Sequence, residues 1–409
     1  MLKESVFEAV PINTSEIPQE HLDLANRVRT NPFPWRGQFS PGLVELLLKK
    51  YAREGSVILD PFAGIGTTLV EAARCNLASI GTEINPAAVA MAGSVVFVPL
   101  RVQQRQRIFD QLRDVLKQNC PADQPLWAES EQAGSPEPFV LSLLRGHEIS
   151  EYERSLLQNT LIRLFEIDGP HTWDDLFRCY RQHCEVVAAL PHSTHSCRIE
   201  NSDARSVPMP DGSVDLVLTS PPYVNVFNYH QNNRPAMELL GWDLLEVAKS
   251  EFGSNRKNRG NRFLTVVQYC IDMFAALIEM KRVLTKSGRA IIVIGRESSV
   301  RGVAFKNGLI VGTLAEASGF RILMRQERKF KNKFGGIIFE DILHIERSET
   351  EGAHSSVAVE IAREALGIAL QKTTEPDVQQ DLKDAIQDST GVPPSPLYRP
   401  PATSSRLVA

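Results

Sequence analysis

The 409 residues of this chain are enough to bury a large core, either as one domain with insertions or as two domains. A hydrophobic content of 43% and a charged content of 23% are those of a soluble globular protein, and the absence of any apolar run near ~20 residues argues against a membrane span. The net charge of −4 excludes a uniformly basic coat but not a local basic face, and six scattered cysteines form no disulfide framework, so we expect a cytoplasmic protein without membrane contact.

The first part of the chain alternates helix and strand signals. Residues 1–30 are polar and weakly patterned, and we expect them to form a lead-in to the main domain. Ser40 and Pro41 have the residue types of a helix start, and Gly55 ends that helix. The elements that follow are a short buried strand, a helix and a second strand, at 57–59, 67–75 and 78–81.

A glycine-containing segment, residues 60–68, links the first of these strands to the helix, and Glu83 follows the second strand. Glycines let backbone amides approach a ligand closely, and an acid in the position of Glu83 can accept both hydroxyls of a ribose. A phosphate site is disfavoured because no Gly-Lys-Ser/Thr ending is present and Leu69 stands where a dinucleotide site has its third glycine. Asp60 also suits a neutral or cationic ligand better than a pyrophosphate.

Residues 99–194 interrupt this rhythm. They contain an amphipathic helix with a basic side, a loop rich in Pro, Glu and Ser, and two further helical patterns, at 101–116, 121–138, 139–167 and 173–190. The basic side is either a solvated face or a grip on nucleic acid. Several Cys and His side chains gather near the end of this region, but their spacing is not that of a structural zinc site, so we predict no metal: Cys179, His183, Cys184, His192, His195, Cys197.

The alternation resumes with a strand that ends at Asp203 and a buried strand at 214–218. The second of these runs into the proline elbow, Thr219-Ser220-Pro221-Pro222-Tyr223. Two consecutive prolines cannot continue a strand, so the backbone must leave the sheet there. The elbow places a hydroxyl, free carbonyls and an aromatic ring at the carboxyl end of a strand, where open α/β sheets bind ligands. An ordinary strand-ending turn is the alternative.

The last part of the chain completes the α/β pattern. A polar and aromatic loop, residues 224–262, precedes a helix, a buried strand, a second helix and two closing strands, at 265–284, 290–295, 307–318, 321–325 and 341–346. Residues 348–390 contain two helical patterns. Residues 391–409 hold five prolines and small polar residues, a composition that predicts disorder.

Two of these segments resemble one known family. Residues 60–68, Asp-Pro-Phe-Ala-Gly-Ile-Gly-Thr-Thr, resemble the S-adenosylmethionine-binding signature of DNA amino-methyltransferases, and the proline elbow resembles their catalytic Ser/Asn/Asp-Pro-Pro-Tyr element. The resemblance covers residues 31–98 and 195–347. It implies an α/β class I methyltransferase domain with a doubly wound, mostly parallel seven-stranded sheet, and with residues 99–194 as an inserted helical subdomain.

The resemblance also implies roles for individual residues. The catalytic set is Ser220, Pro221, Pro222 and Tyr223. The S-adenosylmethionine-binding set is Phe39, Asp60, Pro61, Phe62, Gly64, Gly66, Thr67, Thr68, Glu83 and Asp203. Asp203 would hold the adenine amino group, or cap the turn that follows it. Basic and polar side chains of the late loops are the expected DNA contacts: Asn225, Tyr229, Arg234, Arg256, Lys257, Arg259, Arg262, Lys331, Lys333.

The expected activity is sequence-specific methyl transfer to an exocyclic amine of a base flipped out of double-stranded DNA. A neutral Ser220 cannot be a strong base, and a Ser-Pro-Pro-Tyr element is more usual of cytosine-N4 enzymes, so N4 of cytosine is favoured over N6 of adenine. A restriction endonuclease acting separately is the expected functional partner. The alternatives are an RNA base methyltransferase and a non-catalytic DNA-binding protein with the same fold.

Overall fold

The computed structural model describes residues 7, 10–24, 29–31, 33, 35, 37–120, 134–146, 148–225, 228–254, 260–331, 335–349, 352 and 354–400. Its main sheet has seven strands in the order β3-β2-β1-β4-β5-β9-β8. Their bounds are Val57–Asp60 (β1), Ala78–Glu83 (β2), Cys197–Asn201 (β3), Val214–Thr219 (β4), Leu284–Gly295 (β5), Phe320–Lys331 (β8) and Ile337–Arg347 (β9). The β9 strand pairs antiparallel with both of its neighbours, and the other pairings are parallel. This is the class I methyltransferase sheet, so the predicted fold class is confirmed.

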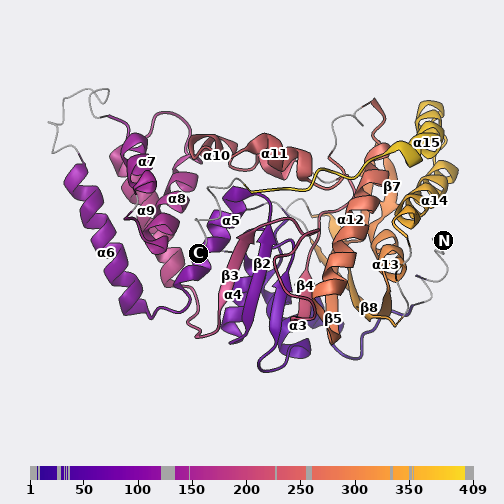
Figure 1. Cartoon of the computed structure of the whole chain (residues 1–409), viewed down its shortest axis with the longest axis horizontal. Helices are drawn as coiled ribbons and strands as arrows, with labels where there is room; N and C mark the ends of the chain where they lie inside the picture. The colour runs from indigo at the N-terminus through magenta and orange to yellow at the C-terminus, as the bar shows by residue number, and fades with distance from the viewer. Residues whose placement is uncertain are drawn as a thin grey trace.

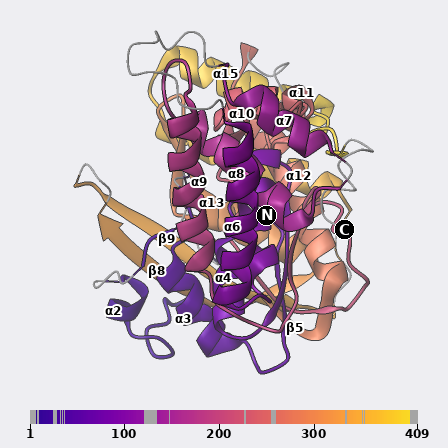
Figure 2. The same ribbon diagram turned by 90° about the vertical axis from the view of Figure 1, so that its left-hand side faces the viewer.

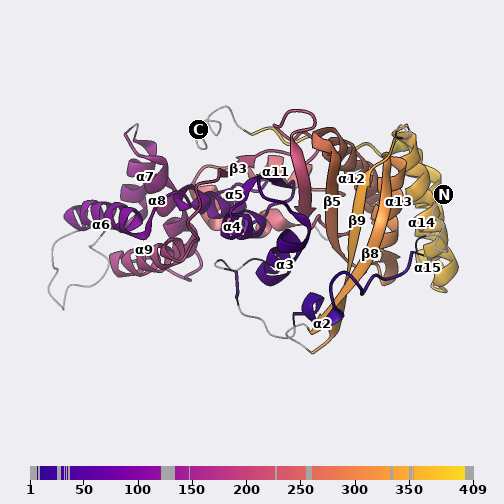
Figure 3. The ribbon, with the colours of Figure 1, turned by 90° about the horizontal axis from the view of Figure 1, so that it is seen from below.

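Helices cover both faces of this sheet (Figures 1 and 3). Neighbouring residues of a strand point to opposite faces, so Ile58 packs with α3 (Pro41–Tyr51) while Leu59 packs with α12 (Leu264–Val283). Both side chains are fully buried, which explains why the central strands are apolar runs without polar alternation. The remaining helices beside the sheet are α4 (Thr67–Arg74), α5 (Pro86–Ala92), η1 (Gly93–Phe97) and α13 (Asn307–Ala317). An outer pair follows, in which α14 (Ser356–Lys372) packs on α12 and α13, and α15 (Pro376–Asp388) packs on α14.

A helical insertion lies between η1 and β3, at one end of the molecule (Figures 1 and 2). It consists of α6 (Val102–Asn119), α7 (Glu137–Arg145), α8 (Glu151–Leu164) and α9 (Trp173–Ala188), which share an apolar core of their own. The predicted helical insertion is therefore confirmed as part of the fold. The exact domain boundaries drawn from the sequence stay predictions.

Arg105 lies inside this insertion and not on its surface. The predicted basic side of the first helix is wrong at this position, because the Arg105 side chain is 1% exposed. Its guanidinium donates to the carbonyls of Leu100, Leu190 and Pro191 at 2.7–2.9 Å, and further carbonyls at the ends of η1 and α9 accept from it as well. Arg105 thus joins the two points at which the chain enters and leaves the helical insertion.

Shorter elements complete the fold. They are α2 (Gln19–Leu22), η2 (Tyr229–Gln231), α10 (Arg234–Leu239), α11 (Leu244–Ser250), a hairpin of β6 (Glu297–Val300) and β7 (Val303–Lys306), and η4 (Ser389–Gly391). The lead-in packs on the sheet edge, where the Asn13 amide donates to the Arg325 carbonyl at 2.7 Å. Within the described ranges, no helix has both the length and the apolar content that crossing a bilayer requires.

The prediction of a disordered tail is wrong for residues 391–400. Val392, Ser395 and Tyr398 are buried, with exposed fractions of 9%, 3% and 5%. Proline lowers the entropy cost of ordering an extended segment, because its ring fixes φ in the folded and the unfolded chain alike. The composition that suggests disorder therefore also suits a stiff segment laid on a prepared surface. Residues 401–409 lie outside the described part of the chain.

Candidate functional site

The candidate site lies at the carboxyl ends of β1, β2 and β4. The chain leaves β1 at Asp60, turns through two glycines in left-handed conformations, Gly64 (φ +50°) and Gly66 (φ +81°), and enters α4 at Thr67. A Cβ at position 66 would stand 2.9 Å from the Ala92 Cβ, so only glycine fits there without displacing α5. Local backbone geometry thus explains both glycines of the signature.

Asp60 fixes the turn from beneath. Its carboxylate accepts the Thr68 hydroxyl at 2.6 Å, the Thr219 hydroxyl at 2.6 Å and the Phe62 amide at 3.1 Å. Burial raises the pKa of this carboxyl to about 6, although the three donors favour its charged form. Asp60 therefore holds α4 and the end of β4 against β1, and its two oxygens are largely engaged by the protein itself.

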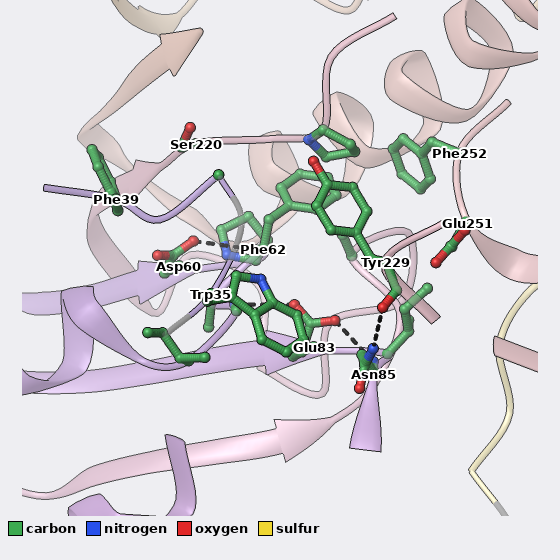
Figure 4. Close-up of a pocket in the computed structure, with 18 of the residues that line it drawn as sticks. Trp35, Phe39, Asp60, Phe62, Glu83, Asn85, Ser220, Tyr229, Glu251 and Phe252 are labelled. Carbon is green, nitrogen blue, oxygen red and sulfur yellow. Dashed lines mark hydrogen bonds between the residues drawn. The ribbon is translucent and has the colours of Figure 1, made fainter. Parts of the chain in front are cut away.

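Glu83 presents its carboxylate at the floor of the cavity (Figure 4). One carboxylate oxygen accepts the Gly64 amide at 3.0 Å and the other accepts the Asn85 amide at 2.8 Å. The Ile84 amide is a further backbone donor to this carboxylate, whose two oxygens together offer about four acceptor sites, so Glu83 keeps capacity to accept a ligand hydroxyl. Burial raises the pKa of Glu83 to about 7, and the nearby charge of Asp60 acts in the same direction.

The cavity collects most of the predicted residues. Its lining includes Phe39, Asp60, Pro61, Phe62, Gly64, Thr67, Glu83 and Asp203 of the predicted cofactor set, together with Ser220 and Pro222 of the elbow. Gly66, Thr68, Pro221 and Tyr223 are not among its lining residues. Figure 4 shows Phe39, Asp60 and Ser220 on one side of the cavity and Glu251 and Phe252 on the other.

Asp203 lines the cavity with a carboxylate that is already paired. It accepts from the Arg205 guanidinium at 2.7 and 2.9 Å, from the Arg205 amide at 2.9 Å and from the Tyr398 amide at 3.0 Å. The bond to the Arg205 amide is the turn-capping role that the sequence left open. The adenine contact stays a prediction.

The proline elbow is held on both sides. The Tyr269 hydroxyl, fully buried on α12, donates to the Pro222 carbonyl at 2.9 Å. The Tyr223 ring lies against Gly295 at the end of β5, where an added Cβ would come within 2.6 Å of Tyr223 Cε2. Burial raises the pKa of the Tyr223 hydroxyl, which keeps this group neutral. The elbow is therefore preset by packing and does not depend on a bound substrate.

Tyr229 occupies a place that the sequence did not predict. We expected a DNA contact on the outer loop, but Tyr229 lines the cavity next to Phe252. Its carbonyl accepts the Asn85 side chain at 3.1 Å. Glu251, 5% exposed, accepts the amides of Asn228 and His230 on either side of it at 3.0 and 2.7 Å. The Asn85-Pro86 pair is a local sequence signal for a helix start and could have directed attention to Asn85. No local pattern marks Glu251 or Phe252 as residues of the cavity.

The other predicted DNA contacts that the structure describes do not line the cavity. Asn225 accepts from Arg262 at 2.6 Å, so these two form a pair beside the β6–β7 hairpin. Arg234 is half-exposed and pairs with Glu238, and Lys331 ends β8 on the surface. Arg256, Lys257, Arg259 and Lys333 lie outside the described residues. Nowhere in the described ranges do three His, Cys, Asp or Glu side chains gather as metal ligands.

Sequence similarity to DNA methylases covers a short stretch of the chain. The family model of DNA methylases of the N6/N4 type matches residues 12–94, which contain the glycine turn and Glu83. The Type II methyltransferase M.MjaII of Methanocaldococcus jannaschii is 47% identical over 53 residues, which are 13% of this chain and 10% of that enzyme. The alignment thus spans about a tenth of the length of this curated relative.

Solved structures resemble the chain more broadly but weakly. A S-adenosylmethionine-dependent methyltransferase of Methanosarcina mazei shares 11% identity with a TM-score of 0.34 and covers 74% of this chain and 97% of its own. The PH0226 protein of Pyrococcus horikoshii OT3 shares 11% with a TM-score of 0.33, over 75% and 88%. Because these TM-scores are low, the fold is defined by the strand order of the sheet and not by these structures.

The chemistry of the cavity fits a sulfonium cofactor. Four carboxylates, those of Asp60, Glu83, Asp203 and Glu251, line it, and none of its described lining residues is Lys, Arg or His. Such a lining offers no cation to pair with phosphate and suits a ligand with positive charge, a carboxylate in the position of Glu83 can accept ligand hydroxyls, and the aromatic walls suit a purine. Over residues 12–94 the chain is similar to DNA methylases of the N6/N4 type, and the cofactor that fits this cavity is S-adenosylmethionine.

Proposed function

We propose that this protein transfers a methyl group from S-adenosylmethionine to the exocyclic amine of a base flipped out of double-stranded DNA, with N4 of cytosine as the target. The observation that carries the proposal is that the elbow and the cofactor turn share one cavity. Thr219 donates to Asp60, and the next residue, Ser220, lines the same cavity as Glu83. A base amine held by the elbow would therefore face the cofactor directly.

The roles of the elbow follow from the chemistry of an aromatic amine. Its nitrogen lone pair is conjugated with the ring, so the amine must be held with that lone pair in line with the methyl group and the departing sulfur. Because Tyr269 engages the Pro222 carbonyl, we assign the Ser220 hydroxyl and the Pro221 carbonyl as acceptors for the two N–H bonds. Tyr223 stacks on the base. The bound cofactor would supply the methyl group and leave as a neutral thioether, and the methylated amine would then release its proton to water, because a neutral serine cannot remove the proton beforehand.

DNA contacts form the second part of the proposal. The Asn225–Arg262 pair, Arg234 and Lys331 are the described side chains that we assign to phosphate or base contacts. Flipping the base costs a few kcal/mol, which such contacts must offset. A restriction endonuclease with the same recognition sequence is the partner that this activity implies, and it would act separately.

Labelled S-adenosylmethionine and genomic DNA test the proposal directly. We expect label in N4-methylcytosine after nucleoside analysis, and about 100-fold slower transfer by Ser220→Ala, which lacks one acceptor. Ser213→Ala is the matched control, because the Ser213 hydroxyl bonds only a neighbouring turn carbonyl. Label in N6-methyladenine would establish the adenine alternative, label in RNA alone the RNA alternative, and no label in either nucleic acid would refute the transfer.

Cofactor affinity should depend on pH through Glu83. The pKa of this group is raised to about 7 by burial, and ribose hydroxyls bind its charged form. The dissociation constant of S-adenosylhomocysteine should therefore rise about tenfold between pH 8 and pH 6, since protonation of Glu83 competes with binding. Calorimetric titration at several pH values measures this change.

Glu83→Gln provides the control for this profile. The variant keeps the shape of the side chain and removes its titration, so its affinity should be weaker at pH 8 and nearly flat down to pH 6. Titration of the ligand itself is common to both proteins and cancels in the comparison. Parallel profiles for the two proteins would contradict the assigned role of Glu83.

A further inference from the structure

The C-terminal strap, residues 391–400, crosses the molecule from α15 to the end of β3. Figure 1 shows it as the yellow trace that passes below α11 towards the side of the helical insertion. Its buried residues, Val392, Ser395 and Tyr398, recur every third position, the period of a polyproline II helix. The segment is therefore laid on the domain in an ordered way, with one face turned inward.

Buried side chains of the domain form hydrogen bonds with the backbone of the strap. Asp272, fully buried on α12, accepts the Ser395 amide at 2.9 Å and the Ser395 hydroxyl at 2.7 Å. Arg205 donates to the carbonyls of Ser395 and Pro396, both at 2.8 Å. Gln268 donates to the Pro393 carbonyl at 3.1 Å. Such specific polar contacts at buried positions indicate a built docking site for this segment and not incidental packing.

Further contacts link the strap to three residues that line the cofactor cavity, namely Asp203, Glu83 and Glu251. Tyr398 donates its amide to Asp203 at 3.0 Å and its hydroxyl to Asn201 at 2.9 Å. Asn201 in turn donates to the Glu83 carbonyl at 2.8 Å, so it ties the end of β2 to the strap. The Ser395 hydroxyl lies 3.1 Å from the carbonyl of Glu251, whose side chain holds the Tyr229 loop.

Arg205 depends on the strap for its own position. Its guanidinium bridges Asp203 and Asp272, two buried carboxylates, and fills its remaining donors with strap carbonyls. Without those carbonyls, a buried guanidinium would keep unsatisfied donors and would turn towards water. Asp203 would then lose the partner that sets its direction at the cavity wall.

We propose that Ser395 and Tyr398 are positioning residues for the cofactor, and that the strap completes the adenosyl end of the cavity by holding Asp203, the backbone at Glu83 and Glu251 in their binding geometry. The inference rests on the S-adenosylmethionine site of the proposed function. It does not depend on the base that is methylated. Neither residue touches the elbow, so the strap acts on cofactor affinity and not on the chemical step.

The test compares full-length variants by cofactor binding and by kinetics. Ser395→Ala/Tyr398→Ala should raise the dissociation constant of S-adenosylhomocysteine about tenfold, because hydrogen bonds at two points of the strap are lost. The KM for S-adenosylmethionine should rise by a similar factor, with kcat at saturating cofactor within about twofold of the wild type. Tyr398→Phe removes only the bond to Asn201 and should recover most of the affinity.

Leu397→Ala is the matched control, because Leu397 lies between the two residues and is 42% exposed. Its dissociation constant should equal that of the wild type. A double variant that melts earlier but binds the cofactor normally would overturn the inference, since the strap would then only pack. A fall in kcat at unchanged affinity would overturn it as well. Calorimetry uses no DNA, so weaker cofactor binding by the double variant would support the inference even if the wild type methylates no DNA. Absence of DNA methylation by the wild type would refute the proposed function alone.

Discussion

Replacement of Gly295 by alanine should slow methyl transfer about 100-fold and leave cofactor affinity unchanged. The new Cβ would stand 2.6 Å from Tyr223 Cε2 and 3.1 Å from Cδ2 and Cζ, so the ring must move away from the end of β5. Because the ring belongs to the elbow, a shift of about 1 Å misplaces the base and the acceptors for its amine. Single-turnover methylation assays and calorimetric titration of S-adenosylhomocysteine measure the two quantities separately.

Gly367→Ala is the matched control, because a Cβ at that position of α14 meets no atom within 4 Å. We expect wild-type transfer rates from this variant and slightly higher stability, since alanine is the better helix former. If Gly295→Ala transferred methyl groups within threefold of the wild-type rate, the placement of Tyr223 in the reaction would be refuted. An equal loss of cofactor affinity would point instead to a general disturbance of the sheet edge.

Arg105→Met should lower the free energy of unfolding by about 3 kcal/mol or more. Methionine fills a similar volume but donates no hydrogen bonds, so the carbonyls of Leu100, Leu190 and Pro191 would remain buried without their donor. Each such carbonyl costs about 1 kcal/mol or more. The effect should concentrate in the helical insertion, where Arg105 joins the entry and the exit of the chain.

Denaturant unfolding measures the loss, and hydrogen exchange locates it. Arg107→Met is the control, because Arg107 lies on the same helix and is exposed, so its replacement should change the free energy by less than about 0.5 kcal/mol. Faster exchange in α6–α9 with unchanged exchange in β1 and β4 would support the role of Arg105. Equal free energies for the two variants would contradict it.

The sequence predicts the sheet well because its central strands are buried on both faces. Runs such as 214–218 and 290–295 have no helical period and are bounded by turn residues, which is why the sequence predicts them as strands. In the structure the carboxyl ends of these two strands lie within one or two residues of the predicted ends. The closing strands were predicted too short. β9 begins at Ile337, and Ile337, Ile338 and Phe339 are exposed, so burial does not mark this part of the strand. The β6–β7 hairpin gave no alternating pattern.

The site was predicted where the chemistry is local in sequence. Glycine geometry, the proline elbow and the acid after the second strand can each be recognised within a few residues. The roles of Tyr229, Glu251, Ser395 and Tyr398 come from contacts between distant segments, such as Ser395 with Asp272, and no local pattern reports these. In the tail the composition was misleading, because proline-rich segments have the same composition whether they are free or docked.

The strap also sets an order of events during synthesis. Tyr398 follows Glu83 by about 315 residues, so at about 5–20 residues per second the two are made roughly 15 to 60 s apart. Asn201 and Asp203 are made within that interval, and from then until its end they lack the hydroxyl and the amide of Tyr398. The nascent sheet can form its strands early, but its ligand cavity is finished only when the far end of the chain returns to it.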